Sequence, residues 1–218
     1  MIPQSLTAVY QLRIYLKEIN PMIWRRLLVP DCTSIADLHA IIQIAMGWEN
    51  SYLHRFDIWG KEYGIAYDGG ISFQDNPRNV FLKDFSFRIN EKFVYEYNFF
   101  DHWEHEIRLE KKVPATTKKI YSCCIGGNFA APPEDCGGPW FFMKLKDYYS
   151  VWRIEEKILE AFERYKADKD LVEFRKTLEE LRYWLTYHQF DRRKVNHQLQ
   201  RYFNNQNQLS IEEIQDED

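Results

Sequence analysis

The first half of the chain alternates between apolar and polar positions. From Tyr10 to Leu16 every second residue is apolar, and the same period returns over residues 23–29, after the break at Asn20-Pro21. A two-residue period indicates a β-strand with one buried face. The two segments therefore predict a pair of neighbouring strands.

The period then changes to that of a helix. Apolar residues recur three or four positions apart from Ile35 to Met46. Ser34 stands where a capping residue is expected, with Asp37 three residues later, and Gly47 suits a C-terminal cap. These features predict one early helix that packs on the sheet.

Alternation resumes in three further segments, 52–59, 93–99 and 103–109, and the last two are close enough to form a hairpin. Residues 60–80 hold four glycines and one proline, which predicts a long loop. Residues 121–139 hold four glycines and three prolines, so we expect no regular structure there.

Beyond Trp140 the apolar spacing is helical, and it forms two stripes of the kind that usually face a core and only sometimes a partner. The first stripe comprises Leu145, Tyr148, Ile154, Ile158, Phe162 and Tyr165, and the second comprises Leu171, Phe174, Leu178, Leu181 and Leu185. Asp191 is placed to cap a short last helix that carries Val195, Leu199 and Phe203.

Together the patterns predict an α+β fold, an antiparallel sheet with one early helix packed on it, followed by a helical C-terminal half. The expected organisation is a single domain over 1–205 (sheet-rich 8–120, loop 121–139, helical 140–203) and an acidic disordered tail over 206–218. The tail is expected because a polar NNQNQ run leads into residues 210–218, which hold five acids and no base.

Charge and cysteine content narrow the function classes. The net charge is −4, but without residues 210–218 the chain holds 29 bases and 28 acids, so its body has no bulk field that would attract nucleic acid or membrane. No apolar run approaches the ~20 residues that span a bilayer. The N-terminus does not have the pattern of a signal peptide. We therefore expect a cytoplasmic protein with reduced thiols, no membrane association, and a protein partner rather than nucleic acid.

A series of short motifs is shared, in order, with one family. They are Pro21-Met22-Ile23-Trp24-Arg25-Arg26, Asp37-Leu38-His39, Ala45-Met46-Gly47-Trp48, Leu53-His54-Arg55-Phe56, the run from Tyr95 to His105, Pro132-Pro133-Glu134-Asp135-Cys136-Gly137-Gly138, Phe190-Asp191 and Val195-Asn196. With these motifs the chain resembles the plasmid pRiA4b open-reading-frame-three-like family over about residues 8 to 203.

The resemblance implies an α+β fold and an unknown function. Some members carry the label of transposon passenger, TnpR-like proteins, which suggests an association with mobile elements. The chain departs from the family before the tryptophan, where it reads Tyr97-Asn98-Phe99-Phe100-Asp101 in place of Tyr-Asp-Phe-Gly-Asp. One acid and one glycine are missing, so an activity that needs both acids at this hairpin tip is in doubt.

One group of residues is a candidate metal site, because cysteine, histidine and carboxylate are the ligands of zinc. Its members are His105, Cys123, Cys124, Glu134, Asp135 and Cys136, with His54 as a further candidate. Both histidines fall on apolar strand faces, where an imidazole needs a partner. The alternative is that PPEDCGG is a rigid turn whose carboxylates accept backbone hydrogen bonds, beside buried inert thiols. In either case we expect this loop to pack against the strand that bears His105.

A catalytic version of this site would use Asp101 and Glu104 as acid or base beside the candidate ligands. A thiol nucleophile would be Cys124 or Cys136 with His105. Against these readings, Asp101 at a hairpin tip is typical of a turn residue, and Glu104 lies on the polar strand face.

The sequence therefore favours a non-catalytic binding or adaptor module of unknown ligand. A metal-dependent hydrolase or nuclease that uses Asp101, His105, Glu134, Asp135 and Cys136, with zinc as the metal, is the alternative. The strand patterns also predict that Trp24 and Trp103 are core residues.

Overall fold

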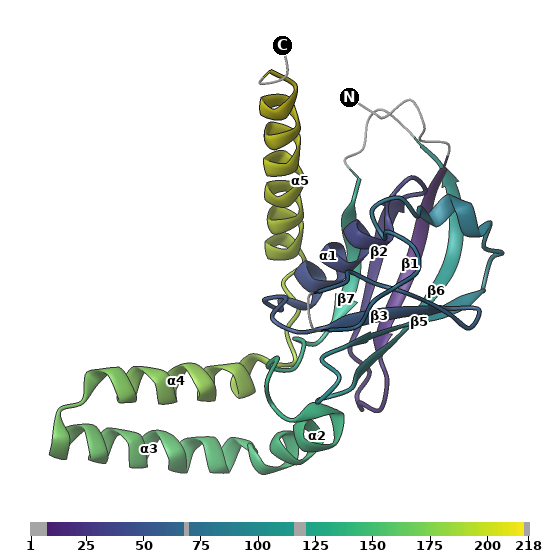
Figure 1. Ribbon diagram of the computed structural model, residues 1–218. Coiled ribbons are helices and arrows are strands. Elements are labelled where there is room, and N and C mark those ends of the chain that lie inside the picture. Colours follow the sequence, from purple (N-terminus) through teal and green to yellow (C-terminus); the bar gives the residue numbers. More distant parts are fainter. Residues whose placement is uncertain (1–7, 68–69, 116–120, 216–218) are drawn as a thin grey trace.

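The part of the chain that the computed structural model describes contains one seven-stranded sheet (Figure 1). The described residues are 8–67, 70–115 and 121–215, with side chains as far as 205. The strands are β1 (Ala8–Leu16), β2 (Trp24–Pro30), β3 (His54–Ile58), β4 (Lys61–Tyr63), β5 (Lys92–Tyr97), β6 (Trp103–Pro114) and β7 (Cys123–Asn128). Their order is β4-β3-β5-β6-β1-β2-β7, and each neighbouring pair is antiparallel. The α+β prediction is confirmed.

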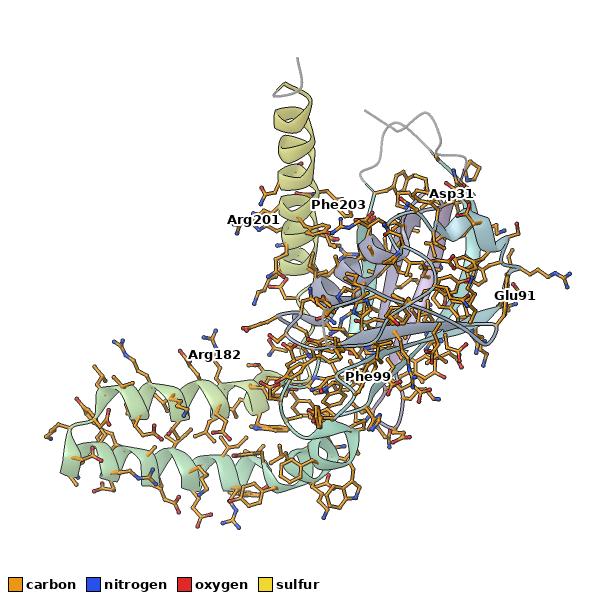
Figure 2. All side chains as sticks on the ribbon, in the orientation of Figure 1. Asp31, Glu91, Phe99, Arg182, Arg201 and Phe203 are labelled. Atoms are coloured by element: carbon orange, nitrogen blue, oxygen red, sulfur yellow. The ribbon has the colours of Figure 1, made fainter. Side chains whose placement is uncertain are left out.

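One face of the sheet carries the core, and helix α1 (Ile35–Met46) packs on it. Figure 2 shows side chains filling the space between α1 and the strands. The predicted caps of α1 are present. The Asp37 backbone N–H donates to Ser34 Oγ at 3.0 Å, and Gly47 closes the helix with a φ of 80°.

The opposite face of the sheet is polar, as the alternation of β6 predicted. Arg26 of β2 donates to Glu110 of β6 at 2.6 Å, past the intervening strand β1, and Lys92 of β5 donates to Glu106 of the neighbouring β6 at 2.9 Å. Each of these partly exposed ion pairs contributes little to stability, but together they make this face of the sheet polar and solvent-exposed.

Arg25 points the other way from Arg26, into the core, because consecutive side chains of a strand lie on opposite faces. Its guanidinium donates to the carbonyls of Ala45 at 2.8 Å, of Trp24 at 2.9 Å and of Asn128 at 3.0 Å, and lies 4.0 Å from the ring centre of Phe190. Burial lowers the pKa of Arg25 to about 10. A charge this deep is stabilised only because carbonyls and a ring face surround it, so Arg25 ties β2 to α1 and β7.

Two segments expected to be irregular contain strands. β7 lies within 121–139 and β4 within 60–80, so the prediction of no regular structure in 121–139 is wrong. β7 pairs with β2 at the sheet edge, with Cys124 opposite Leu27. Its glycines give room to aromatic rings, since a Cβ at Gly127 would lie 2.4 Å from the Phe190 ring. This packing could not be predicted from the sequence around β7, because the rings come from distant segments.

The prediction for Trp24 is also corrected. Trp103 is fully buried, as expected, whereas Trp24 is only half buried. Trp24 lies on the polar face of β2, with the guanidinium of Arg26 5.2 Å from its ring centre. The strand was predicted correctly, but the inward face of β2 belongs to Arg25 and Leu27.

The C-terminal half is helical, as predicted: α2 (Gly138–Tyr148), α3 (Val151–Asp168), α4 (Leu171–Thr186) and α5 (Arg192–Gln215). The first predicted stripe is divided by the break between α2 and α3, where Ser150 caps α3. α3 and α4 form an antiparallel hairpin that projects from the sheet (Figure 1), called the arm below. Ile158 and Phe162 of that stripe are exposed on the arm and do not face the core.

α5 begins against the body and then extends beyond it (Figure 1). Its Asn196 exchanges two hydrogen bonds with the backbone of Cys124, at 2.7 and 2.9 Å. The helix continues to Gln215, so residues 206–215, expected to be disordered, are helical, and 216–218 lie outside the described residues. Once Val195 and Leu199 have anchored a helix, each further residue extends it at little cost. None of the described helices is long and apolar enough to cross a membrane.

Candidate functional site

The PPEDCGG loop is docked on the body by hydrogen bonds from two indoles. Trp48 Nε1, just after α1, donates to Pro132 O at 2.9 Å, and Trp103 Nε1, at the start of β6, donates to Glu134 O at 3.0 Å. Trp103 is two residues from His105 on the same strand. The prediction that this loop packs against the strand of His105 is confirmed.

Two glycines allow the loop to approach the tip of the β5–β6 hairpin. Gly137 and Gly138 have φ values of 88° and 81°, which side chains rarely adopt. The Gly137 N–H donates to Asp101 Oδ2 at 3.2 Å. A Cβ at Gly138 would lie 2.3 Å from the carbonyl oxygen of Asp101, so the close approach requires glycine there.

The Glu134 carboxylate accepts hydrogen bonds from the segment after α1. The backbone N–H groups of Glu49 and Ser51 donate to it at 2.7 and 3.4 Å. The hydroxyl of Tyr97 also donates to Glu134. Burial, and then this bond, raise the pKa of Tyr97. Glu134 therefore accepts backbone hydrogen bonds, as expected for a loop that is a rigid turn.

A cleft of about 650 Å³ opens between this loop, the end of α1 and the inner part of α4. Its walls include three aromatic residues, Trp48, Tyr183 and Trp184. Four carboxylates line it, those of Glu49, Glu134, Asp135 and Glu180, and no lysine, arginine or histidine is among its lining residues. None of these carboxylates takes part in an ion pair within the described ranges.

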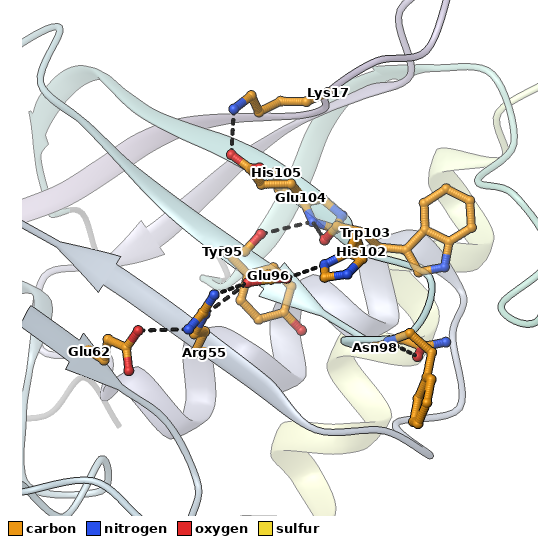
Figure 3. A network of polar contacts seen from close by, with 11 residues as sticks. Lys17, Arg55, Glu62, Tyr95, Glu96, Asn98, His102, Trp103, Glu104 and His105 are labelled. Atoms are coloured by element: carbon orange, nitrogen blue, oxygen red, sulfur yellow. Dashed lines mark hydrogen bonds and ion pairs between the residues drawn. The ribbon is translucent and has the colours of Figure 1, made fainter. Parts of the chain in front are cut away.

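His105 is fully buried. Figure 3 shows its ring close to Tyr95 and Trp103. Its Nδ1 lies 3.0 Å from Trp103 O and 3.3 Å from Tyr95 O, which places the proton on that nitrogen. Nε2 has no hydrogen-bond partner among the described residues. Burial lowers the pKa of His105 to about 4, so the ring is neutral at pH 7. Trp48 meets it edge-on, with ring centres 5.4 Å apart.

His54 does not meet His105; it stacks on His39 of α1, with ring centres 3.5 Å apart. His39 Nδ1 lies 2.8 Å from the Tyr95 hydroxyl, and Nε2 lies 2.6 Å from Asn50 Oδ1. Burial lowers the pKa of His39 to about 4 and that of His54 to about 2. Two protonated rings would repel each other at this separation, so both rings are neutral at pH 7.

The cysteines of the candidate set lie in two different parts of the fold. Cys124 is on β7, and β1 and β2 lie between β7 and the strand of His105. Its thiol donates to Gly126 O at 3.3 Å. Cys136 is in the docked loop, where burial raises the pKa of its thiol to about 12. All four cysteines, Cys32 and Cys123 included, are free of disulfides.

Of the residues considered for metal binding or catalysis, the structure brings Asp101, Glu134, Asp135 and Cys136 into one region. Among the described residues, no group of three or more histidine, cysteine, aspartate or glutamate side chains is arranged to hold a metal ion. The Glu104 carboxylate pairs with Lys17 on the polar face (Figure 3).

Several cleft residues were not singled out from the sequence. Glu49 follows the Ala45–Trp48 motif, and Glu180, Tyr183 and Trp184 come from α4. The available signal was that Tyr183 and Trp184 are large aromatic residues outside the leucine stripe of that helix. Their approach to the PPEDCGG loop depends on tertiary packing, including a hydrogen bond of 3.0 Å from the Tyr183 hydroxyl to Ala131 O.

Comparison with known proteins places these features in a family. The family described as "Plasmid pRiA4b ORF-3-like protein" matches residues 8–199. The uncharacterized protein y4hQ of Sinorhizobium fredii (strain NBRC 101917 / NGR234) is 32% identical over 142 residues, which are 63% of this chain and 71% of that protein. The crystal structure of a protein of unknown function, MM3350 from Methanosarcina mazei Go1, matches with a TM-score of 0.63 and 31% identity, covering 88% of this chain and 98% of that one.

Proposed function

Since the chain belongs to the plasmid pRiA4b ORF-3-like family, whose relatives above have no stated activity, we propose a function from its own chemistry. The protein is a non-catalytic binding module, and the cleft beside the PPEDCGG loop is its recognition site. The ligand is a positively charged segment of a partner protein. This proposal rests on one observation: the cleft is lined by four carboxylates and by aromatic rings, and no lysine, arginine or histidine is among its lining residues.

The hydrogen-bonding groups of the cleft favour a ligand that donates. Trp48 Nε1 and the Tyr183 hydroxyl, which could have donated to a ligand, already donate to carbonyls of the loop. The Glu49 N–H donates to Glu134. Each carboxylate keeps lone pairs free, since it can accept about four hydrogen bonds. Lysine ammonium has three donors and no acceptor, and arginine guanidinium has five donors, so either complements this cleft.

The shape and field of the cleft favour the same ligand. Its volume lies within the ~300–1,000 Å³ typical of ligand sites. A cleft lined by charges of one sign attracts the opposite charge. The rings of Trp48 and Trp184 can contact the aliphatic stem of lysine or arginine while its charged end reaches a carboxylate.

The groups that acid–base chemistry would need are engaged elsewhere, which supports a non-catalytic role. Asp101 accepts from Gly137, Glu104 pairs with Lys17, and His105 is buried with one nitrogen bonded to backbone. An association with mobile genetic elements forms part of the proposal, and its support is the plasmid in the family's name.

The test is calorimetric titration with short capped peptides that carry lysine, arginine, glutamate or norleucine at one central position. We expect the lysine and arginine peptides to bind more tightly than the norleucine peptide, and the glutamate peptide to bind least. Glu49→Gln with Glu180→Gln should weaken the basic peptides about tenfold or more, which corresponds to ~1.4 kcal/mol.

The matched control is Glu179→Gln. Glu179 adjoins Glu180 on α4 and is exposed, but it does not line the cleft. It should leave peptide binding unchanged. Equal binding of all four peptides, or equal effects of the cleft and control variants, would contradict the proposal.

A further inference from the structure

The arm carries half of the large exposed apolar side chains in the part of the chain that the structure describes. Its seam holds the buried residues Ile154 and Ala161 from α3 and Leu181 from α4. The rings of Tyr165 and Phe174 also stack between the two helices, with centres 5.1 Å apart. Beyond the seam, however, Phe162 is 48% exposed, Leu171 45% and Leu185 44%. Figure 1 shows the arm projecting from the sheet, so the body does not cover this surface.

Apolar residues outside the seam follow a regular spacing on both helices. On α4, the exposed Leu171 and Leu185 and the partly buried Leu178 recur every seven residues, and on α3 the exposed Val151 and Ile158 do the same. A seven-residue repeat is the pattern of helices that pack against further helices. The buried seam residues are at other positions. The repeat therefore forms a second apolar surface, of the kind against which another pair of helices packs.

The two stripes lie on the same side of the arm. On each helix the exposed stripe is rotated in the same sense from the buried seam, by the 100° per residue of an α-helix. In an antiparallel pair, equal rotations bring both stripes to one side. We name this surface the apolar face, and its residues are Val151, Ile158, Phe162, Leu171, Leu178 and Leu185.

The exposed charged side chains that border the apolar face indicate which partner packs on it. Glu155 of α3 and Arg175 and Arg182 of α4 border it and are exposed, and none of them has an ion pair in the part of the chain described. Figure 2 shows Arg182 extending from α4 into solvent. A two-fold axis parallel to the helices would set α3 of one copy against α4 of the other, and therefore acid against base. A perpendicular axis would set α3 against α3 and bring the two Glu155 side chains together.

We propose that two copies of this chain associate through the apolar face into a four-helix bundle, with α3 of each copy against α4 of the other. The cleft remains open in this dimer. Glu180 and Tyr183, which line it, lie on the other side of α4 from Leu178 and Leu185. Self-association and ligand binding therefore use separate surfaces.

The experiment is sedimentation equilibrium of the full chain and its variants. The wild type should be a dimer, and Phe162→Glu with Leu171→Glu should raise the dissociation constant at least a hundredfold. The control is Val172→Glu, which puts one glutamate on α4 next to Leu171, at a residue that is 79% exposed but outside the apolar face. It should leave the dimer intact.

A charge exchange tests the arrangement with exposed residues that folding does not need. Glu155→Arg and Arg182→Glu should each weaken the dimer, and the double variant should restore it. A monomeric wild type, or equal effects of Val172→Glu and the apolar-face variant, would overturn the proposal. A dimer that the double exchange fails to restore would overturn the α3-against-α4 arrangement.

Discussion

At the residue scale, Glu134 connects the PPEDCGG loop to the segment after α1. Its carboxylate is the acceptor for two backbone N–H groups and for the Tyr97 hydroxyl. Its own carbonyl accepts from Trp103. Removing the carboxylate would leave these donors without their acceptor, which costs more than the hydrogen bonds themselves contribute.

Glu134→Ala should therefore lower the free energy of unfolding by ~2–3 kcal/mol, in the range for hydrogen bonds to a charged group. Glu49→Ala is the control, because the Glu49 side chain lines the same cleft without an ion pair among the described residues. It should cost less than ~0.5 kcal/mol. Urea unfolding measures both, and similar losses would show that Glu134 is not the anchor of the loop.

The buried histidines make stability depend on pH. The pKa of His39 and of His105 falls from 6.5 to about 4, and that of His54 to about 2. Above pH 6.5 both folded and unfolded chains hold these rings neutral. Below pH 6.5 the three histidines bind protons in the unfolded chain but stay neutral in the folded chain. The free energy of unfolding therefore falls as the pH drops towards 4.

Each of these histidines should remove ~1.4 kcal/mol of unfolding free energy per pH unit well below pH 6.5. His54→Gln should lower the slope of unfolding free energy against pH by the contribution of one proton. Urea midpoints between pH 7.5 and 4.5 give the slopes. An unchanged slope in His54→Gln would mean that His54 is protonated in the folded protein.

At the scale of elements, Gly47 at the end of α1 and Gly138 at the end of the PPEDCGG loop are required for different reasons. Gly47 and Gly138 share a positive φ, of 80° and 81°. A Cβ at Gly47 would meet nothing within 4 Å, whereas one at Gly138 would collide with the backbone of Asp101. Only Gly138 therefore sets how closely the loop approaches the hairpin.

Gly47→Ala should cost about 1 kcal/mol, the strain of a left-handed residue, while Gly138→Ala should cost at least ~2 kcal/mol more because the loop must shift. Chemical unfolding gives the energies, and Trp103 fluorescence reports the position of the loop. Equal costs would indicate that the loop tolerates displacement and is not fixed on the hairpin.

Elements with a strong local signal could be predicted from the sequence. The caps of α1 and the alternation of β1 and β6 fix those elements within a few residues. β7 has no such signal, because its glycines make sense only beside the rings of Trp24 and Phe190, which come from distant segments. The same limit applies to the candidate site: its loop was predicted from PPEDCGG, but its wall from α4 was not.

At the scale of the whole molecule, the chain combines a compact sheet body with projecting helices. The stripes on α3 and α4 were read as core-facing, although only one side of each helix packs in the seam. Periodicity shows that a helix has an apolar side, but it does not show whether the same chain covers it. The cleft forms where the arm meets the body, so it depends on the arrangement of the whole chain.

The central claim, that this cleft recognises a positively charged segment, is tested most directly by amide and indole NMR shifts during titration with the lysine peptide. The predicted result is that the largest changes fall on Glu49, Ser51, Glu180 and the Trp184 indole, and that they are absent with the glutamate peptide. Shifts of equal size with both peptides, or shifts centred away from these residues, would contradict the claim.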